Sequence, residues 1–273
     1  MEIILTQKNR LVTTNDQMET IRRLSFFSAR LYNEGLYNVR QYFFNNNNYL
    51  NYGKNYHICK TSNNYKMLLT DIAQQTLRLV ERNFKSFFAL LKLKSAGKYS
   101  EKVRPPKYKR EEYGMIAVCG RSARIKDGYV LVGLTTEFKK TYQPVATTLK
   151  FKLPKNITAT RLQELRIIPN FDGKEFDIEF VYKKEVQPPK QLDQNKYLSI
   201  DCGVNNFATC FDSTNGASFI LSGKRLKSVN HWYNKEKSRL QGIYEHQKRD
   251  MNTKGFIKLS KKRTDVINDF MNR

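Results

Sequence analysis

The chain has 273 residues, and its 49 lysines and arginines outnumber the 25 aspartates and glutamates, which gives a formal charge of +24 at pH 7. An apolar content of 40% supports packed cores, so the composition excludes a disordered basic tail. The sequence has no signal-peptide pattern and no stretch of the apolar length that spans a bilayer, so we expect no membrane association.

The amino-terminal part predicts a strand followed by a long helix. Residues 3–13 are typical of a strand, and Asp16 with Glu19 three residues later is the pattern of a capping box that opens a helix. Apolar residues at helical spacing begin at Ile21. The asparagine run at residues 45–48 is expected to end this helix.

A second long helix is the clearest local signal. Its apolar residues fall on one stripe between Leu69 and Leu91, which predicts a face packed in a core. Arg78 and Arg82 lie off the stripe. Either a solvated face or contact with nucleic acid explains these two arginines, and both interpretations stay open.

After residue 98 the apolar period changes from helical to alternating. Asp-Gly pairs at positions 127 and 172 are hairpin signals between short strands, and several such strands predict a small barrel. The strand before the helices would complete that barrel, which makes the helical region an insertion in it. The short strands that we predict here cover residues 122–126, 129–134 and 176–182.

Paired prolines in residues 187–190 mark a domain boundary. Beyond it, three short strands are predicted at residues 197–201, 207–211 and 218–221. The first of them ends in Asp201. Three consecutive strands joined by tight turns, with a carboxylate on the first, are typical of the opening of an RNase H-like sheet.

Asp201 is the candidate catalytic and metal-binding residue. Phosphodiester cleavage by metal ions needs several carboxylates, because two hard cations about 4 Å apart must be held together. One carboxylate is not such a site. Taken alone, Asp201 is better explained as a turn-forming aspartate at the end of a strand.

Cysteine and histidine give no further site. The four cysteines contain no C-x-x-C pair, so we expect reduced, structural thiols and no zinc site. The three histidines are too dispersed to indicate a general-base pair. The residues concerned are Cys59, Cys119, Cys202, Cys210, His57, His231 and His246.

The charge excess indicates a polyanionic partner. Nucleic acid fits best, because each phosphate that Lys or Arg contacts releases condensed counterions. A membrane surface fits less well, since the basic residues are spread along the whole chain and are not gathered on one amphipathic helix.

Residues 197–209, with the sequence YLSIDCGVNNFAT, resemble the first RuvC motif of the TnpB (OrfB) family. These transposon-encoded proteins are RNA-guided DNA endonucleases related to type V CRISPR effectors. Further stretches resemble the family in the same order along the chain. They are residues 73–75 and 84–88 in the second helix, residues 106–109 (PKYK), and residues 227–241, 261–263 and 269–270.

The resemblance implies an α+β protein with a wedge-type β-barrel, interrupted by a helical recognition insert and followed by a partial RNase H-like (RuvC) α/β domain. The implied domains are residues 1–13 for the first barrel strand, 14–98 for the insert, 99–190 for the rest of the barrel and 191–273 for the amino-terminal part of the RuvC domain. The implied location is the cytoplasm, in association with the nucleoid.

The resemblance also implies partners, a cofactor and contacts. The partners are guide RNA and target DNA, with no small-molecule substrate, and the complete family nuclease uses Mg²⁺ or Mn²⁺. Base pairing reads most of the sequence while the protein holds the backbones. The residues expected to bind nucleic acid are Arg78, Arg82, Lys107, Lys109, Arg225, Lys261, Lys262 and Arg263.

The family nuclease combines the aspartate that matches Asp201 with a later glutamate and a last aspartate, and the sequence stops before the strand of that glutamate. Asp265 and Asp269 match family positions outside the active site. We therefore expect no DNA cleavage by this chain alone. An incomplete sequence, an interrupted gene and a product kept for binding, such as a catalytically inactive repressor, all stay open; a basic RNA-associated protein without a transposon role would leave the Asp201 segment unexplained.

Overall fold

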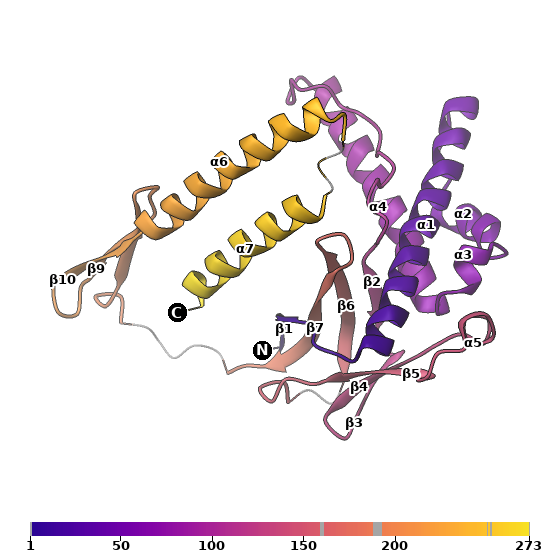
Figure 1. The fold of residues 1–273 in the computed structure, drawn as a ribbon, viewed down its shortest axis with the longest axis horizontal. Helices are drawn as coiled ribbons and strands as arrows, with labels where there is room; N and C mark the ends of the chain where they lie inside the picture. Colours follow the sequence, from indigo (N-terminus) through magenta and orange to yellow (C-terminus); the bar gives the residue numbers. More distant parts are fainter. Residues whose placement is uncertain (1, 159–160, 188–192, 250, 252, 273) are drawn as a thin grey trace. The chain divides into compact units, whose positions relative to one another are not determined.

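The computed structural model describes residues 2–158, 161–187, 193–249, 251 and 253–272. The chain forms two compact units, Met1–Val186 and Gln187–Arg273, which we describe separately (Figure 1). The boundary predicted at residues 187–190 lies, apart from Gln187, outside the described residues. Within these described ranges, no helix is both long enough and apolar enough to cross a membrane.

The first long helix begins two residues earlier than the capping box predicted. α1 spans Asn15–Asn46, and its N-cap is Thr14, whose hydroxyl accepts the backbone N–H of Gln17 at 3.4 Å. Asp16 therefore lies in the first turn, where a negative charge is favourable beside the helix dipole. The helix ends at the predicted asparagine run, with Asn47 in the left-handed conformation (φ 47°).

The second long helix, α4, spans Thr70–Ser95 and buries the predicted apolar stripe. It packs along α1, and the shorter helices α2 (Tyr52–Cys59) and α3 (Asn63–Lys66) pack against the same pair. A cluster of aromatic rings, including the fully buried Phe84, joins α1 to α4.

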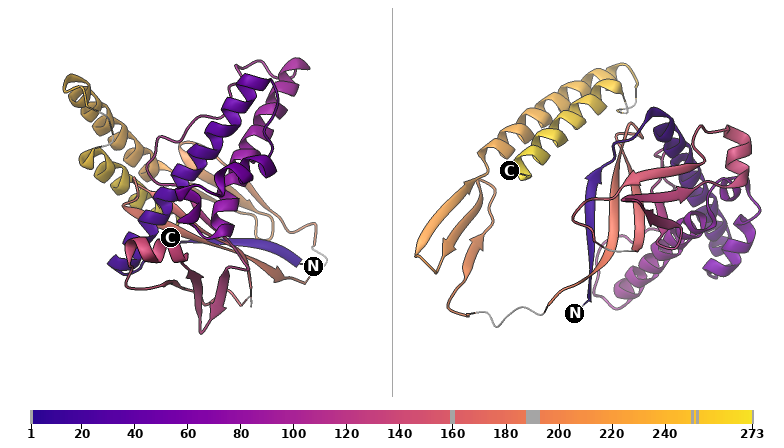
Figure 2. Two further views of the ribbon diagram at one scale, coloured as in Figure 1. Left: turned by 90° about the vertical axis from the view of Figure 1, so that its right-hand side faces the viewer. Right: turned by 90° about the horizontal axis from the view of Figure 1, so that it is seen from below.

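The first unit also contains two antiparallel sheets. The larger sheet has the strand order β1-β7-β6-β2 and the smaller one β3-β4-β5. The first strand therefore pairs with one near the end of the unit, so all the helices from α1 to α4 form an insertion between β1 and β2, as Figure 2 shows for the first strand beside β7. The strands are β1 Glu2–Arg10, β2 Ile116–Cys119, β3 Ala123–Lys126, β4 Tyr129–Gly133, β5 Thr148–Lys152, β6 Leu162–Asn170 and β7 Glu175–Glu185.

The hairpin turns follow the sequence prediction. Asp127 and Gly128 both have positive φ values, 50° and 73°, as a two-residue turn between twisted strands requires. The turn between β6 and β7 likewise contains Asp172 and Gly173 with positive φ. The predicted strands at 122–126, 129–134 and 176–182 are confirmed. The hairpin signal at residue 172 implied a strand where β6 lies but gave it no bounds, and β2, β5 and the short helix α5 (Thr136–Tyr142) were not predicted.

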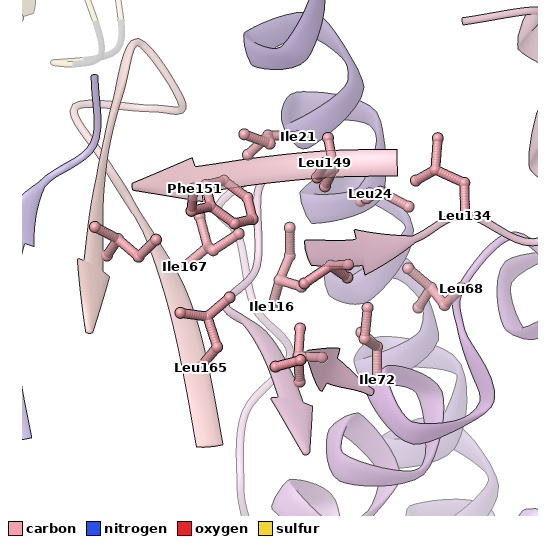
Figure 3. Close-up of a cluster of buried hydrophobic side chains, with 14 of the residues drawn as sticks. Ile21, Leu24, Leu68, Ile72, Ile116, Leu134, Leu149, Phe151, Leu165 and Ile167 are labelled. Atoms are coloured by element: carbon pink, nitrogen blue, oxygen red, sulfur yellow. The ribbon is translucent and has the colours of Figure 1, made fainter. Parts of the chain in front are cut away.

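One hydrophobic core joins the helices to both sheets. Figure 3 shows side chains of α1 and α4 meeting those of the larger sheet and of the smaller one. The mixed helix-and-sheet class predicted from the sequence is confirmed. Closure of the two sheets into a barrel stays a prediction. The labelled core residues are Ile21, Leu24, Leu68, Ile72, Ile116, Leu134, Leu149, Phe151, Leu165 and Ile167.

The second unit consists of a three-stranded antiparallel sheet and a helical hairpin. The strands are β8 (Leu198–Asp201), β9 (Asn206–Asp212) and β10 (Ala217–Ser222), in the order β10-β9-β8. The three predicted strands are thus confirmed within one or two residues. The helices α6 (Lys224–His246) and α7 (Lys254–Met271) lie side by side (Figure 2).

Candidate nuclease carboxylate and nucleic-acid interface

Asp201 is the last residue of β8, an edge strand of the second unit's sheet. It pairs in register with Thr209 of β9, whereas its neighbour Ile200 pairs with Cys210. Since successive side chains of a strand point to opposite faces, the carboxylate and Ile200 lie on different faces. Asp201 is exposed, so solvent or a ligand reaches it directly.

The described part of the chain contains no group of three or more His, Cys, Asp or Glu side chains arranged to hold a metal ion. The other aspartate of the sheet, Asp212, pairs with Leu198 at the opposite end of β8. Its carboxylate accepts the backbone N–H and the hydroxyl of Thr214 at 2.9 and 2.6 Å, and these bonds lower its pKa. Asp201 alone therefore does not fit a two-metal site, and we derive no chemical step from it.

The loop after Asp201 is fixed by hydrogen bonds. The backbone N–H groups of Gly203 and Gly223 donate to the carbonyls of Asn206 and Asn205, each at 3.1 Å, and the ammonium of Lys227 donates to the Asn205 side chain at 2.7 Å. A Cβ at Gly203 would lie 3.0 Å from the Asn206 carbonyl oxygen, so a larger residue there would require the loop to shift slightly. A hollow of about 350 Å³ lies beside this loop and is lined by residues that include Val204, Phe207, Leu226, Lys227, Asn230 and His231.

Helix α4 carries a basic face on the first unit. Arg78, Arg82 and Lys85 are exposed at helical spacing, on the side away from the core. The Arg78 guanidinium lies 4.6 Å from the ring centroid of Tyr52, and Lys85 forms an ion pair with Glu81 at 3.4 Å. The structure thus leaves Arg82 and the outward side of Arg78 available to an anionic partner.

Arg121 belongs to the same surface, although no sequence pattern indicated it. Together with Arg78, Arg82 and Lys85 it lines a hollow of about 470 Å³. Its Nε donates to both carboxylate oxygens of the buried Asp71 at 3.0 Å, and a second guanidinium nitrogen and the Ser122 hydroxyl donate to that carboxylate as well. The Arg121 guanidinium is the main cause of the lowered pKa of Asp71.

Lys107 and Lys109, both predicted phosphate contacts, occupy different environments. Lys107 is exposed. Lys109 is half-buried, its ammonium lies 4.7 Å from the ring centroid of Tyr32, and burial lowers its pKa. Its backbone exchanges two hydrogen bonds with the Asn33 side chain, at 2.8 and 2.9 Å. Lys109 therefore contributes to anchoring the segment, and its contact with nucleic acid stays a prediction.

The four basic residues predicted in the second unit lie on the α6–α7 hairpin. Arg225 pairs with Asp269 at 3.6 Å, Lys262 lies 5.1 Å from the Trp232 ring centroid, and Arg263 donates to Asn230 at 2.8 Å. Lys261 is half-buried. All four predicted contacts with nucleic acid remain predictions.

Comparison with known proteins gives one family. Residues 179–273 match the model of the OrfB_IS605 family, described as a probable transposase. The resemblance that the Asp201 motif predicted is therefore confirmed for this part of the chain. No curated protein sequence matches the chain.

Two solved structures are similar at low identity. A cryo-EM structure of a CRISPR-Cas12f ternary complex aligns with 93% of this chain at 13% identity and a TM-score of 0.43, and that of a Cas12f1–sgRNA–target DNA complex with 97% at 17% identity and 0.41. The alignments span 58% and 66% of those chains, so the chain covers less than two thirds of either protein.

Proposed function

We propose that this TnpB-like chain binds a guide RNA and, through it, target DNA, as the amino-terminal portion of a transposon-associated RNA-guided DNA endonuclease. The observation that carries the proposal is the OrfB match over residues 179–273, which contains the Asp201 strand. The charge of +24 supports a nucleic-acid partner independently.

In this proposal the two units hold nucleic-acid backbones, and base pairing with the guide selects the target. Arg78, Arg82 and Arg121 offer cations on one surface of the first unit. The domains are those that the family implies, a wedge barrel with a helical recognition insert in residues 1–190 and RuvC-type structure from residue 191.

Asp201 is proposed as one metal-binding carboxylate of an RNase H-like centre that takes Mg²⁺ or Mn²⁺. When bound, such ions activate water and stabilise the leaving oxygen. We expect no cleavage by residues 1–273 alone, because one carboxylate does not hold two cations.

A second candidate is a catalytically inactive RNA-guided DNA-binding protein that acts as a repressor. It is favoured by the fact that, among the described residues, Asp201 belongs to no group of three or more His, Cys, Asp or Glu side chains that could hold a metal ion. The two candidates differ in the carboxylates that they require. The endonuclease needs further metal-binding carboxylates from additional sequence, whereas the repressor needs only to bind RNA and DNA.

The experiment is co-purification. The chain is expressed together with the DNA that flanks its gene, isolated at moderate salt, and the bound RNA is sequenced. One discrete RNA from the flanking DNA supports guide binding, whereas only mixed RNA that is lost at raised salt contradicts it. Asp201→Asn is the matched control, because a metal-binding carboxylate makes no contribution to retaining the RNA.

A further inference from the structure

Two exposed aromatic rings flank an arginine on the surface of the first unit. Phe44, near the end of α1, is 54% exposed, and Tyr108, in the segment that follows α4, is 41% exposed. Arg40 lies one helical turn before Phe44. Its guanidinium carbon is 5.4 Å from the Phe44 ring centroid and 5.3 Å from that of Tyr108.

Hydrogen bonds and aromatic packing hold these three side chains in place. Arg40 donates to the Pro106 carbonyl at 2.6 Å, which fixes the guanidinium. The Asn33 side chain fixes the backbone of Lys109, the residue after Tyr108, through two hydrogen bonds. Phe44 contacts Phe43, which packs against the buried aromatic cluster between α1 and α4. Both rings are therefore attached to rigid structure.

The segment that carries Tyr108 is basic. Residues 102–110 contain five cations and no acidic residue. Lys107, next to Tyr108, is exposed. Exposed aromatic rings beside a guanidinium plane are what proteins use to stack unpaired bases, and neighbouring cations then contact the phosphates. A duplex offers less to such a surface, because its bases already stack on one another.

We propose that Arg40, Phe44 and Tyr108 form a stacking platform for unpaired bases of RNA. The proposal rests on the proposed function and deepens it: the platform takes a single-stranded segment of the guide, and Lys107 contacts its backbone. The platform should therefore contribute to RNA affinity through base stacking, and this contribution should not depend on salt concentration.

The test compares two probes and two kinds of variant in the full chain. The probes are a short oligouridine that carries one 2-aminopurine and an RNA duplex of the same length. For Phe44→Ala/Tyr108→Ala we expect about a tenfold or larger loss of affinity for the unpaired probe. We also expect the quenching of 2-aminopurine to disappear, affinity for the duplex to stay within about twofold, and the dependence of binding on salt to stay unchanged.

Three variants serve as controls. Lys107→Ala should lower the salt slope by about 0.7 and keep the quenching. Tyr108→Phe keeps the ring and should bind like the original chain, which separates loss of stacking from loss of folding. Phe219→Ala removes an equally exposed ring in the second unit and should leave the unpaired probe bound as before.

The outcomes separate the two proposals. If the original chain binds the oligouridine and the double variant binds it equally well, or loses both probes alike, the platform is wrong and guide binding stands. If the original chain binds no RNA at any salt concentration, the proposed function fails and the platform with it.

Discussion

Both units of the chain contain helices and antiparallel strands, but they bury very different numbers of apolar side chains. In the first unit, helices and both sheets close around shared cores. In the second, Ala208 and Cys210 are the buried hydrophobic residues among the residues described, and neither α6 nor α7 has a fully buried side chain.

The apolar residues of the second unit are nevertheless numerous. Leu198, Ile200, Phe219, Ile220 and Leu221 are each between 45% and 58% exposed, and they lie on the outer strands of a three-stranded sheet. The difference shows that an alternating pattern determines the strands, whereas burial depends on what covers them. Surface of this kind is normally covered in a folded protein.

The strongest test of this difference in burial is to remove one large aromatic ring from each unit. Phe84→Ala should cost about 3–5 kcal/mol of unfolding free energy, because Phe84 is fully buried and leaves a cavity. Phe219→Ala should cost about 1 kcal/mol or less, because that ring is 45% exposed. Urea unfolding followed by circular dichroism measures both, and equal losses would contradict the contrast between the units.

A smaller effect is expected at the polar link between α4 and the sheet. Asp71→Asn should cost about 1–3 kcal/mol, because a buried carboxylate loses its bonds to Arg121 and Ser122. The pKa of Asp71 is lowered in the folded state, so its contribution is present above the ordinary value of 3.8 and is lost as the pH falls through the lowered value. Thermal unfolding across that range should show a weaker dependence on pH for the variant, and identical curves would contradict this role.

The smallest effect is expected on the hairpin of the second unit. Arg225→Ala should change stability by about 0.5 kcal/mol or less, because its pair with Asp269 is long and about half exposed on each side. If Arg225 also contacts a phosphate, RNA binding by the variant should lose about one unit of salt slope. A titration at several salt concentrations measures this, and an unchanged slope would limit Arg225 to its contact within the hairpin.

Local patterns predicted the elements that carry their own signal. The stripe of α4 and the strands around the Asp-Gly turns follow from spacing and turn chemistry, and so do the three strands around Asp201. The N-cap was assigned to Asp16 instead of Thr14, because both are good capping residues and they lie only two positions apart. β2 was missed because, unlike the equally short β3, it does not adjoin an Asp-Gly turn.

The site was less predictable because its residues meet through tertiary contacts. The Arg121 guanidinium is positioned by its hydrogen bonds to Asp71, which lies fifty residues earlier. Lys109 is half-buried because its backbone bonds to the Asn33 side chain and its ammonium lies over the Tyr32 ring. Arg40 and Phe44 do carry a signal, since an arginine and an aromatic residue four apart share a helix face. Tyr108 and Phe44 approach the same guanidinium only in the folded unit.

The pairing of β1 with β7 has a consequence for the order in which the protein is made. The first strand emerges from the ribosome early, but its partner, Glu175–Glu185, is synthesised some 175 residues later. At roughly 5–20 residues per second, the partner strand of β1 is synthesised roughly 9 to 35 seconds after it. Helices α1 and α4 are synthesised before then, so the whole helical insertion leaves the ribosome before the strand that pairs with β1.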